Sequence, residues 1–462
     1  MTETTPKLSL REKLGFGSFS MASNIVYQFK SLYYLFFLTN VLHISMATAG
    51  TILSLGIVWD AVNDPLVGFY AVNHRFKNGE RVRPFALWYA VPWAVTLVLI
   101  FTNFNASPTG TVVIASVAYF FFELFNTCTA IPYNSMGGLA TNRDEDRRSI
   151  NANRNIGGCL GTAIGAVSCM PLLKLFGGLD ASGNLDKVHG SAGFFKVACL
   201  MGVICIIGCF IHYFTTKERV QPEGDEDEHI GLIETFKALY SYKPFVMNTL
   251  YILLYGIVNL LLLTCLTYYC TYVMGSTSAV TMIQAAYLVC SLAMSFLVGP
   301  IDRRIGRKKT MLLGGVFYVV GKIWFVIDPY SLPALYVNAT TTGIAVSITF
   351  IMFNTNRNNL SDLVAWREGR RMDGMIGTAD NLASKLGEAI AAKLMTGALA
   401  ASGWDHTLDV QPQSAIDAIN AMVGIVPAIV GVLIVVVVLA LHVDDDLKRL
   451  HEGTLPRRKA KA

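Results

Sequence analysis

Long apolar stretches separated by short polar loops run through the whole chain. A stretch of about 20 predominantly apolar residues is long enough to cross a bilayer as an α-helix. Twelve such stretches are predicted, at residues 17–41, 46–72, 84–103, 110–139, 151–177, 191–215, 244–274, 278–300, 309–327, 331–355, 374–401 and 415–442. Hydrophobic residues make up 53% of the 462 positions and charged residues only 15%, whereas a soluble domain carries about 25% charged residues. The pattern predicts an all-α membrane protein with twelve transmembrane helices.

The basic residues are concentrated in alternate loops. Most of the 37 lysine and arginine residues fall in the N-terminus, in the tail after the last apolar stretch, and in every second connection. The other connections hold one basic residue, Lys187. Because short cytoplasmic loops carry an excess of Lys and Arg, this asymmetry predicts an integral protein of the cytoplasmic (inner) membrane with both termini in the cytoplasm.

An acidic polar segment, Val220–His229, divides the apolar stretches into two sets of six. The domains predicted from it are an N-terminal six-helix half at 1–215, a cytoplasmic linker at 216–243, a C-terminal six-helix half at 244–442 and a cytoplasmic tail at 443–462. The loops after the second and eighth stretches share an order of acidic, basic, Gly and basic residues, as expected for the two parallel repeats of the major facilitator fold. Basic cytoplasmic loops would give the same similarity without a repeat.

The second apolar stretch contains the sequence WDAVNDP, which places two carboxylates and an amide inside a predicted span. Asp60, Asn63 and Asp64 lie at i, i+3 and i+4 and therefore share one helix face. Pro65 has no N–H, which leaves the carbonyl of Ala61 without its helical donor. Ionisable side chains at membrane depth are costly and mark ion or substrate pathways. These oxygens suit a hard monovalent cation or a proton; the alternative is a pair of acids neutralised by basic side chains of another helix.

Three glycines in the fifth apolar stretch, Gly157, Gly161 and Gly165, are spaced four residues apart. Small residues at this spacing let two membrane helices approach closely. The spacing therefore predicts a packing face on this helix.

Six motifs, in order along the chain, resemble those of the glycoside–pentoside–hexuronide:cation symporters, a major facilitator family that includes melibiose permease. WDAVNDP closely resembles the hallmark of the second span of that family. The other five motifs lie at 17–41, 79–85, 131–135, 144–154 and 361–387. The last of them is shortened around residues 362–371 relative to the family pattern.

The resemblance implies a cation site and a sugar site. Carried over position by position, the cation-binding residues are Asp60, Asn63, Asp64 and Thr127. Na⁺ is the coupling ion expected from these ligands, with H⁺ as the alternative. The basic sugar-site residues of the family align with Arg154 and Lys385.

Two departures from the family concern the substrate. The two carboxylates that hold the galactoside in melibiose permease align here with Asn24 and Ala130, so a neutral galactoside is expected to be held poorly. Lys30 is a basic residue that the family pattern does not contain. Losing two acids and gaining a lysine makes the predicted cavity more positive.

The basic residues Lys30, Arg154 and Lys385 favour an anionic, uronide-like sugar, since the guanidinium of an arginine can bind a carboxylate in a bidentate manner. The alternative is internal pairing, either of Lys385 with Glu388 or of Lys30 and Arg154 with Glu123, Asp60 or Asp64. The complete set of substrate-binding candidates is Asn24, Tyr27, Lys30, Arg154, Asn381 and Lys385.

The predicted function is cation-coupled symport of a sugar or glycoside. The alternative is an uncoupled or proton-linked carrier of a non-sugar amphiphile or lysolipid on the same fold. No catalytic residues are assigned, because the sequence contains no H-E-x-x-H or G-x-S-x-G motif and no Cys/His cluster, so an enzyme is not expected. No cofactor and no metal beyond the coupling cation are expected. The partners expected are a small-molecule sugar and membrane lipid, without nucleic acid, and the protein is expected to be a monomer.

Overall fold

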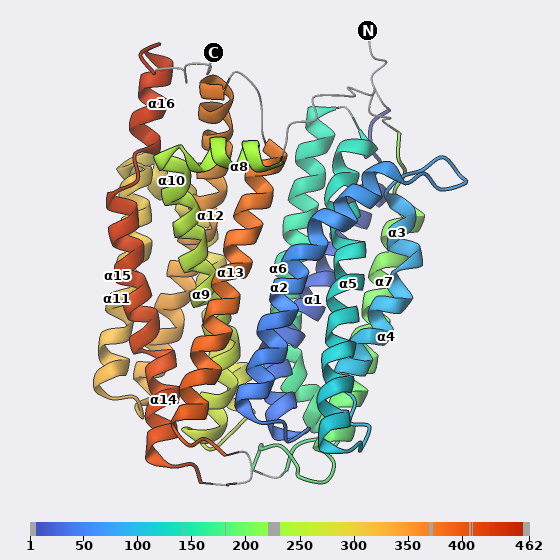
Figure 1. Cartoon of the computed structure of the whole chain (residues 1–462), viewed down its shortest axis with the longest axis vertical. Helices are drawn as coiled ribbons and strands as arrows, with labels where there is room; N and C mark the ends of the chain where they lie inside the picture. The colour runs from blue at the N-terminus through green and yellow to red at the C-terminus, as the bar shows by residue number, and fades with distance from the viewer. Residues whose placement is uncertain are drawn as a thin grey trace. The chain divides into compact units, whose positions relative to one another are not determined.

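The computed structural model describes residues 6–141, 143–180, 182–219, 232–368, 373–405, 408 and 410–455. Within these ranges every regular element is a helix, and the one β-bridge, between Leu179 and Leu185, is isolated (Figure 1). The helices are α1 (Leu10–Asn40), α2 (Met46–Asn73), α3 (Arg83–Trp88), α4 (Ala90–Ile100), α5 (Pro108–Ala140), α6 (Asp144–Leu175), α7 (Gly190–Thr215), α8 (Leu232–Tyr240), α9 (Lys243–Tyr272), α10 (Ala279–Ile305), α11 (Arg307–Ile327), α12 (Leu332–Glu368), α13 (Asp373–Ala401), α14 (Gln413–Val423), α15 (Ile425–Leu439) and α16 (Val443–His451).

Each of the twelve predicted stretches coincides with one helix or with a pair of consecutive helices. Two stretches are divided in the structure, into α3 and α4 and into α14 and α15. Both breaks precede a proline by four residues, since α3 ends at Trp88 before Pro92 and α14 ends at Val423 before Pro427. Because proline has no N–H, the carbonyl four residues earlier loses its helical hydrogen bond, which weakens the helix at both breaks, although α2, α5, α6 and α10 each continue through a proline.

Nine helical segments of the described chain are long and apolar enough to cross a membrane. They correspond to α3 with α4, to α5, α6, α7, α9, α10, α11 and α12, and to the segment from α14 into α16. Three helices that match predicted stretches, α1, α2 and α13, are not among the nine. Most of the predicted site residues lie on these three helices. The polar side chains at those positions lower the hydropathy of the helices.

The structure extends the helices beyond the predicted spans. The stretch predicted at 331–355 is part of α12, which continues to Glu368, and a short helix, α16, follows the last span. Within the predicted linker at 216–243, α8 is helical, whereas the acidic segment Val220–His229 lies outside the described residues. The basic end of the tail at 456–462 also lies outside them.

The chain packs into two compact units. Unit 1 comprises Met1–Glu226, Leu266–Ala285 and Thr396–Ile416, and unit 2 comprises Asp227–Cys265, Ala286–Met395 and Asp417–Ala462. In unit 1, α1 packs against α6 and α7, and α2 packs against α5. In unit 2, α11 packs against α12 and α15.

The glycine face of α6 is packed against α1. A Cβ atom on Gly157 would overlap the backbone of Gly17, and one on Gly161 would overlap the backbone of Met21. Gly165, one turn further along, meets Ile25 in the same way. The predicted close approach is therefore confirmed, and it explains why α1 and α6 make the most extensive helix pair of unit 1.

Ion pairs and a capping box fix the N-terminal end of α1, outside the apolar core. Ser9 accepts a hydrogen bond from the backbone N–H of Glu12, whose carboxylate in turn accepts one from the backbone N–H of Ser9. Lys13 pairs with Asp146 of α6 at 3.0 Å, and the N–H of Leu8 also donates to this carboxylate. Burial raises the pKa of Asp146, but the hydrogen bonds from Lys13 and Leu8 outweigh it and hold the pKa below the ordinary value.

A lysine is buried in unit 2. Lys322 on α11 is 3% exposed, and its ammonium group donates to Asn338 Oδ1 and Thr342 Oγ1 of α12. Thr342 also donates to Asn338, both to its backbone oxygen and to its side-chain oxygen. The charge is therefore held by neutral acceptors that also bond to one another.

Candidate functional site

Two carboxylates of α2 converge on one hydroxyl of α5. Thr127 Oγ1 lies 2.9 Å from Asp60 Oδ1 and 3.2 Å from Asp64 Oδ1, and its single proton can be donated to either. Thr127 itself is only 2% exposed. The structure thus brings together three of the four predicted cation-binding residues, although Thr127 lies more than 60 positions along the chain from the two acids.

The fourth residue, Asn63, lies on the same face of α2 and is fully buried. Neither its side-chain oxygen nor its side-chain nitrogen has a hydrogen-bond partner among the described residues. Burying an amide without partners costs about 1–3 kcal/mol, so this side chain requires an explanation. A bound ion or water that takes the amide oxygen as a ligand would supply one.

Prolines in both helices add further oxygens near these positions. Pro65 follows Asp64 within α2, and Pro132 lies five residues after Thr127 within α5. Since proline cannot donate, the carbonyls of Ala61 and Cys128 have no helical N–H to accept from. Backbone carbonyls of this kind are suitable ligands for hard cations, which prefer oxygen.

Packing between α2 and α5 fixes the geometry of the acids. The ring of Trp59 stacks on that of Phe120, with centroids 4.0 Å apart. One turn earlier, Gly56 faces the ring of Tyr119 so closely that a Cβ atom at this position would overlap it. These contacts set the distance between the helices and so place Asp60 opposite Thr127.

Lys30 of α1 is paired with Glu123 of α5. Its Nζ lies 2.8 Å from Glu123 Oε1, and the side chain of Glu123 is only 2% exposed. The ring centroids of Tyr27, Tyr119 and Phe122 lie 5.6, 5.7 and 5.8 Å from the same ammonium. Lys30 was interpreted either as a substrate-binding residue or as a member of an internal ion pair, and the structure contains the internal pair. It also places Tyr27, another substrate-binding candidate, beside this ammonium.

Asn24, the third candidate on α1, faces α6. Its Nδ2 donates to the backbone oxygen of Ser20 at 2.8 Å, and its Oδ1 accepts from Thr162 at 3.3 Å. Asn24 and Lys30 therefore belong to two different contacts of α1, one with α6 and one with α5.

Arg154 is held by α5 near the end of that helix. Its guanidinium donates to the backbone oxygens of Tyr133 at 2.5 Å and of Asn134 at 3.4 Å. The group also stacks over the rings of Tyr133 and Phe16, at 4.3 and 5.1 Å. Its Nε is buried and has no hydrogen-bond partner in the part of the chain that the structure describes. Two of the five N–H donors of the guanidinium are thus used to position the side chain, and the Nε–H is among those that a ligand could take.

The last two candidates, Asn381 and Lys385, lie on α13 within unit 2. Asn381 is exposed and Lys385 is half-buried. The neighbouring Asp380 is 1% exposed and pairs with Arg357 of α12 at 2.6 Å. The sequence did not indicate this pair, because Arg357 lies just beyond the stretch predicted at 331–355 and only the longer α12 places it opposite α13.

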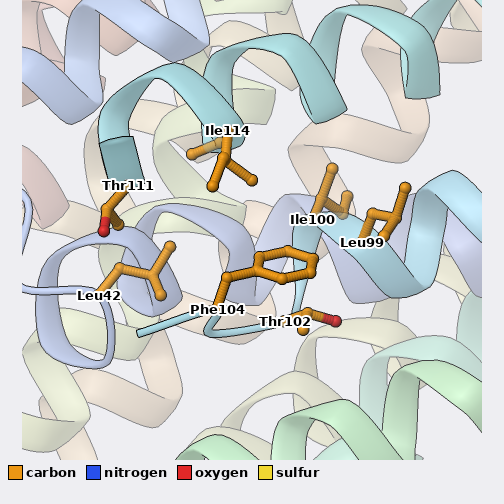
Figure 2. Close-up of a pocket in the computed structure, with 8 residues that line it drawn as sticks. Leu42, Leu99, Ile100, Thr102, Phe104, Thr111 and Ile114 are labelled. Atoms are coloured by element: carbon orange, nitrogen blue, oxygen red, sulfur yellow. The ribbon is translucent and has the colours of Figure 1, made fainter. Parts of the chain in front are cut away.

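A small pocket elsewhere in unit 1 has a different character. Figure 2 shows it between the adjoining ends of α1, α4 and α5, lined by Leu42, Leu99, Ile100, Thr102, Phe104, Thr111, Ile114 and Ala115. Its two hydroxyls already donate to backbone oxygens, Thr102 to Val98 and Thr111 to Ala106. Its lining carries no charged side chain, so it does not resemble the acidic cluster of α2 and α5.

The apolar helices, with ionic groups inside several of them, are those of a polytopic membrane protein. The family of MFS/sugar transport proteins matches residues 15–445 of this chain, and the chain belongs to that family. This result confirms the resemblance to the glycoside–pentoside–hexuronide:cation symporters, a family of transporters with the major facilitator fold.

Three relatives cover almost the whole chain. The isoprimeverose transporter of Lactiplantibacillus pentosus is 28% identical over 88% of this chain and 84% of its own. The inner membrane symporter YicJ of Escherichia coli is 26% identical over 91% and 89%. A protein of the same organism named as a candidate exporter of 2,3-dihydroxypropane-1-sulfonate is also 26% identical, over 94% and 92%.

A solved structure shows the same fold at low sequence identity. The bacterial homologue of the human lysosomal transporter Spinster, in an inward-facing and unoccupied conformation, matches with a TM-score of 0.69 over 98% of both chains at 14% identity. The all-α fold in the major facilitator arrangement is therefore confirmed.

Proposed function

We propose that the chain is a sugar or glycoside symporter that couples transport to a monovalent cation bound by Asp60, Asn63, Asp64 and Thr127. The observation that carries this proposal is the convergence of two carboxylates on the Thr127 hydroxyl beside a fully buried amide without partners. A sugar substrate is supported by the family and by the isoprimeverose transporter among its relatives. The charge of the loops supports the cytoplasmic membrane with both termini in the cytoplasm.

Na⁺ is favoured over H⁺ as the coupling ion by the types of ligand in the cluster. A proton needs only a carboxylate, whereas a hard cation is coordinated by several oxygens. A hydroxyl, an amide and two carbonyls without helical donors accompany the carboxylates here. These neutral oxygens would serve no purpose in a simple proton site.

The substrate is proposed to carry a negative charge. Arg154 is positioned by backbone carbonyls and rings, which leaves its Nε for a ligand. In unit 2, Lys385 adds a second basic side chain on α13. A relative is named for a sulfonate, which is an anion. A uronide or another acidic sugar suits the guanidinium of Arg154, and separately the ammonium of Lys385, better than a neutral galactoside does.

Ligand-induced thermal stabilisation of the purified protein tests the proposal. Matched neutral glycosides and uronides are compared with and without Na⁺ at constant ionic strength. We expect a larger shift of the unfolding temperature with the uronide, and a further increase with Na⁺. Stabilisation by a non-sugar amphiphile alone would instead support the alternative carrier.

The Asp64→Asn variant makes the same experiment specific to the cation site. We expect it to abolish the effect of Na⁺ while a sugar-dependent shift persists at high sugar concentration. Asp445→Asn, which removes an exposed carboxylate of α16, is the matched control and should behave like the wild type. A Na⁺ effect that survives in Asp64→Asn would contradict the assignment.

A further inference from the structure

One face of α5 carries more than the Thr127 hydroxyl. Tyr119, Glu123 and Thr127 follow one another at intervals of four residues, so they lie on one face of the helix. The side chain of Tyr119 lies next to that of Glu123 on this face. Glu123 is thus one helical turn away from the residue on which Asp60 and Asp64 converge.

The negative charge of Asp60 acts on the part of α5 that carries Tyr119 and Glu123. Asp60 lies near enough to act electrostatically on both Glu123 and Tyr119. The charged and titratable groups around Glu123 are therefore Lys30 and Tyr34 of α1, Asp60 of α2 and Tyr119 of its own helix. Asp60 and Asp64 meet at Thr127, and Asp60 also acts on Glu123, which holds the ammonium of Lys30.

The ammonium of Lys30 is bound as a small cation would be. A carboxylate holds it at 2.8 Å, and three aromatic rings face it at 5.6 to 5.8 Å. An independent sign that the acids Asp60 and Asp64 accept a further ligand is Asn63, whose fully buried amide has no partner among the described residues.

We propose that Glu123 is a third acidic residue of the cation site, and that Lys30 is its tethered counter-ion and competes electrostatically with the coupling cation. The inference rests on the proposed cation coupling. A cation bound between Asp60 and Asp64 cancels part of the negative charge that holds Lys30. The ammonium then becomes more available to an anionic substrate.

This arrangement links the two ligands without a direct contact between them. The cation weakens the hold of the acids on Lys30, and an anionic substrate that takes up Lys30 leaves the acids more attractive to the cation. Each ligand therefore raises the affinity of the other, as reciprocal coupling requires.

Na⁺ titration of charge variants in the absence of sugar tests the inference. The midpoint of Na⁺-induced thermal stabilisation is measured at constant ionic strength and at one mildly alkaline pH for wild type, Lys30→Met, Glu123→Gln and the double variant. A unit charge one helical turn away, at about 5–6 Å and an effective dielectric constant of about 20, changes the affinity for an ion by at least about tenfold. We expect Lys30→Met to bind Na⁺ about tenfold more tightly, Glu123→Gln about tenfold more weakly, and the double variant to return near the wild type.

The opposite signs distinguish this role from a structural one. A pair that only stabilises the fold would lower the unfolding temperature of both single variants but leave the Na⁺ midpoints unchanged. Unchanged midpoints, or midpoints that move in the same direction, would overturn the inference. If Lys30→Met does not fold, Glu123→Gln and the double variant still test it, because the second substitution should reverse the loss of affinity.

A matched control separates this inference from the proposed function. Lys322→Met removes a buried ammonium, in unit 2, and should leave the Na⁺ midpoint unchanged. A wild type without any Na⁺ response would contradict both the coupling and the inference. A wild type that responds, with variants that do not follow the predicted signs, would contradict the inference alone.

Discussion

Lys30 of α1 is partly exposed and Lys322 of α11 is buried, and the groups that hold their ammonium ions differ. Lys30 faces the carboxylate of Glu123, so its charge is balanced by an opposite charge. Lys322 faces the amide oxygen of Asn338 and the hydroxyl of Thr342, which are neutral. The first lysine belongs to a pair of ions, whereas the second is a single ion solvated by the protein.

This difference decides what each lysine can do. Removing one member of a buried ion pair leaves the other charge without compensation, whereas replacing a whole buried pair by apolar groups is often harmless. A paired ammonium can also change partners when the local charge changes. An ammonium held by neutral groups has no charged partner that a change in local charge could weaken. Lys322 therefore contributes to stability only at the contact between α11 and α12.

The largest effect is expected when only one side of the charged pair is removed. Lys30→Met leaves Glu123 buried without its counter-ion, which should lower the free energy of unfolding by about 3–5 kcal/mol. The double variant with Glu123→Gln should recover most of this loss, because no isolated charge remains. Thermal unfolding in one detergent measures the stability of the wild type and of both variants. A double variant as unstable as Lys30→Met would contradict the charge compensation between Lys30 and Glu123.

A smaller effect is expected at the lysine held by neutral groups. Lys322→Met leaves no unbalanced charge, and Thr342 and Asn338 still bond to one another. Its unfolding free energy should therefore stay within about 1–2 kcal/mol of the wild type, since removal of a desolvated ion offsets the lost contacts. A loss as large as that of Lys30→Met would show that the two sites do not differ as proposed.

The smallest effect is expected at the Lys13–Asp146 pair, outside the apolar core. The pKa of Asp146 is lower in the folded protein than its ordinary value of 3.8. Its contribution is therefore complete above that value and is lost as the pH falls through the lower folded pKa. Asp146 is buried, and the amide oxygen of Asp146→Asn can still accept from the N–H of Leu8, so the variant should lose about 0.5–1.5 kcal/mol at neutral pH and show a weaker loss of stability in acid. Unfolding midpoints across the acid range measure this, and curves that stay parallel would contradict it.

The helices could be predicted from the sequence because their signal is local. The length of each apolar stretch sets the span, whereas the breaks before Pro92 and Pro427 were not predicted, since prolines such as Pro65 lie inside continuous helices. The glycines of α6 indicated a close contact, but not that its partner is α1. The extension of α12 to Glu368 was missed because polar residues can continue a helix beyond its apolar part.

The candidate site could be predicted only in part. The spacing of Asp60, Asn63 and Asp64 put them on one face, and the family resemblance supplied Thr127. The partner of Lys30 was left open among three acids, because a contact between residues 93 positions apart has no local signal. The backbone carbonyls that hold Arg154 were not foreseen, since every residue offers a carbonyl and none is marked in the sequence.

The contact between α1 and α6 also has a consequence for biosynthesis. The glycines that receive the backbone of α1 are translated only after α2 to α5 have been made. The helix α1 enters the membrane first, and its packing surface is then covered by lipid or by an insertion factor. This surface can contact α6, its main partner, only after the ribosome has produced that helix. A ribosome stalled before Gly157 would thus hold α1 in a state that the finished protein never contains.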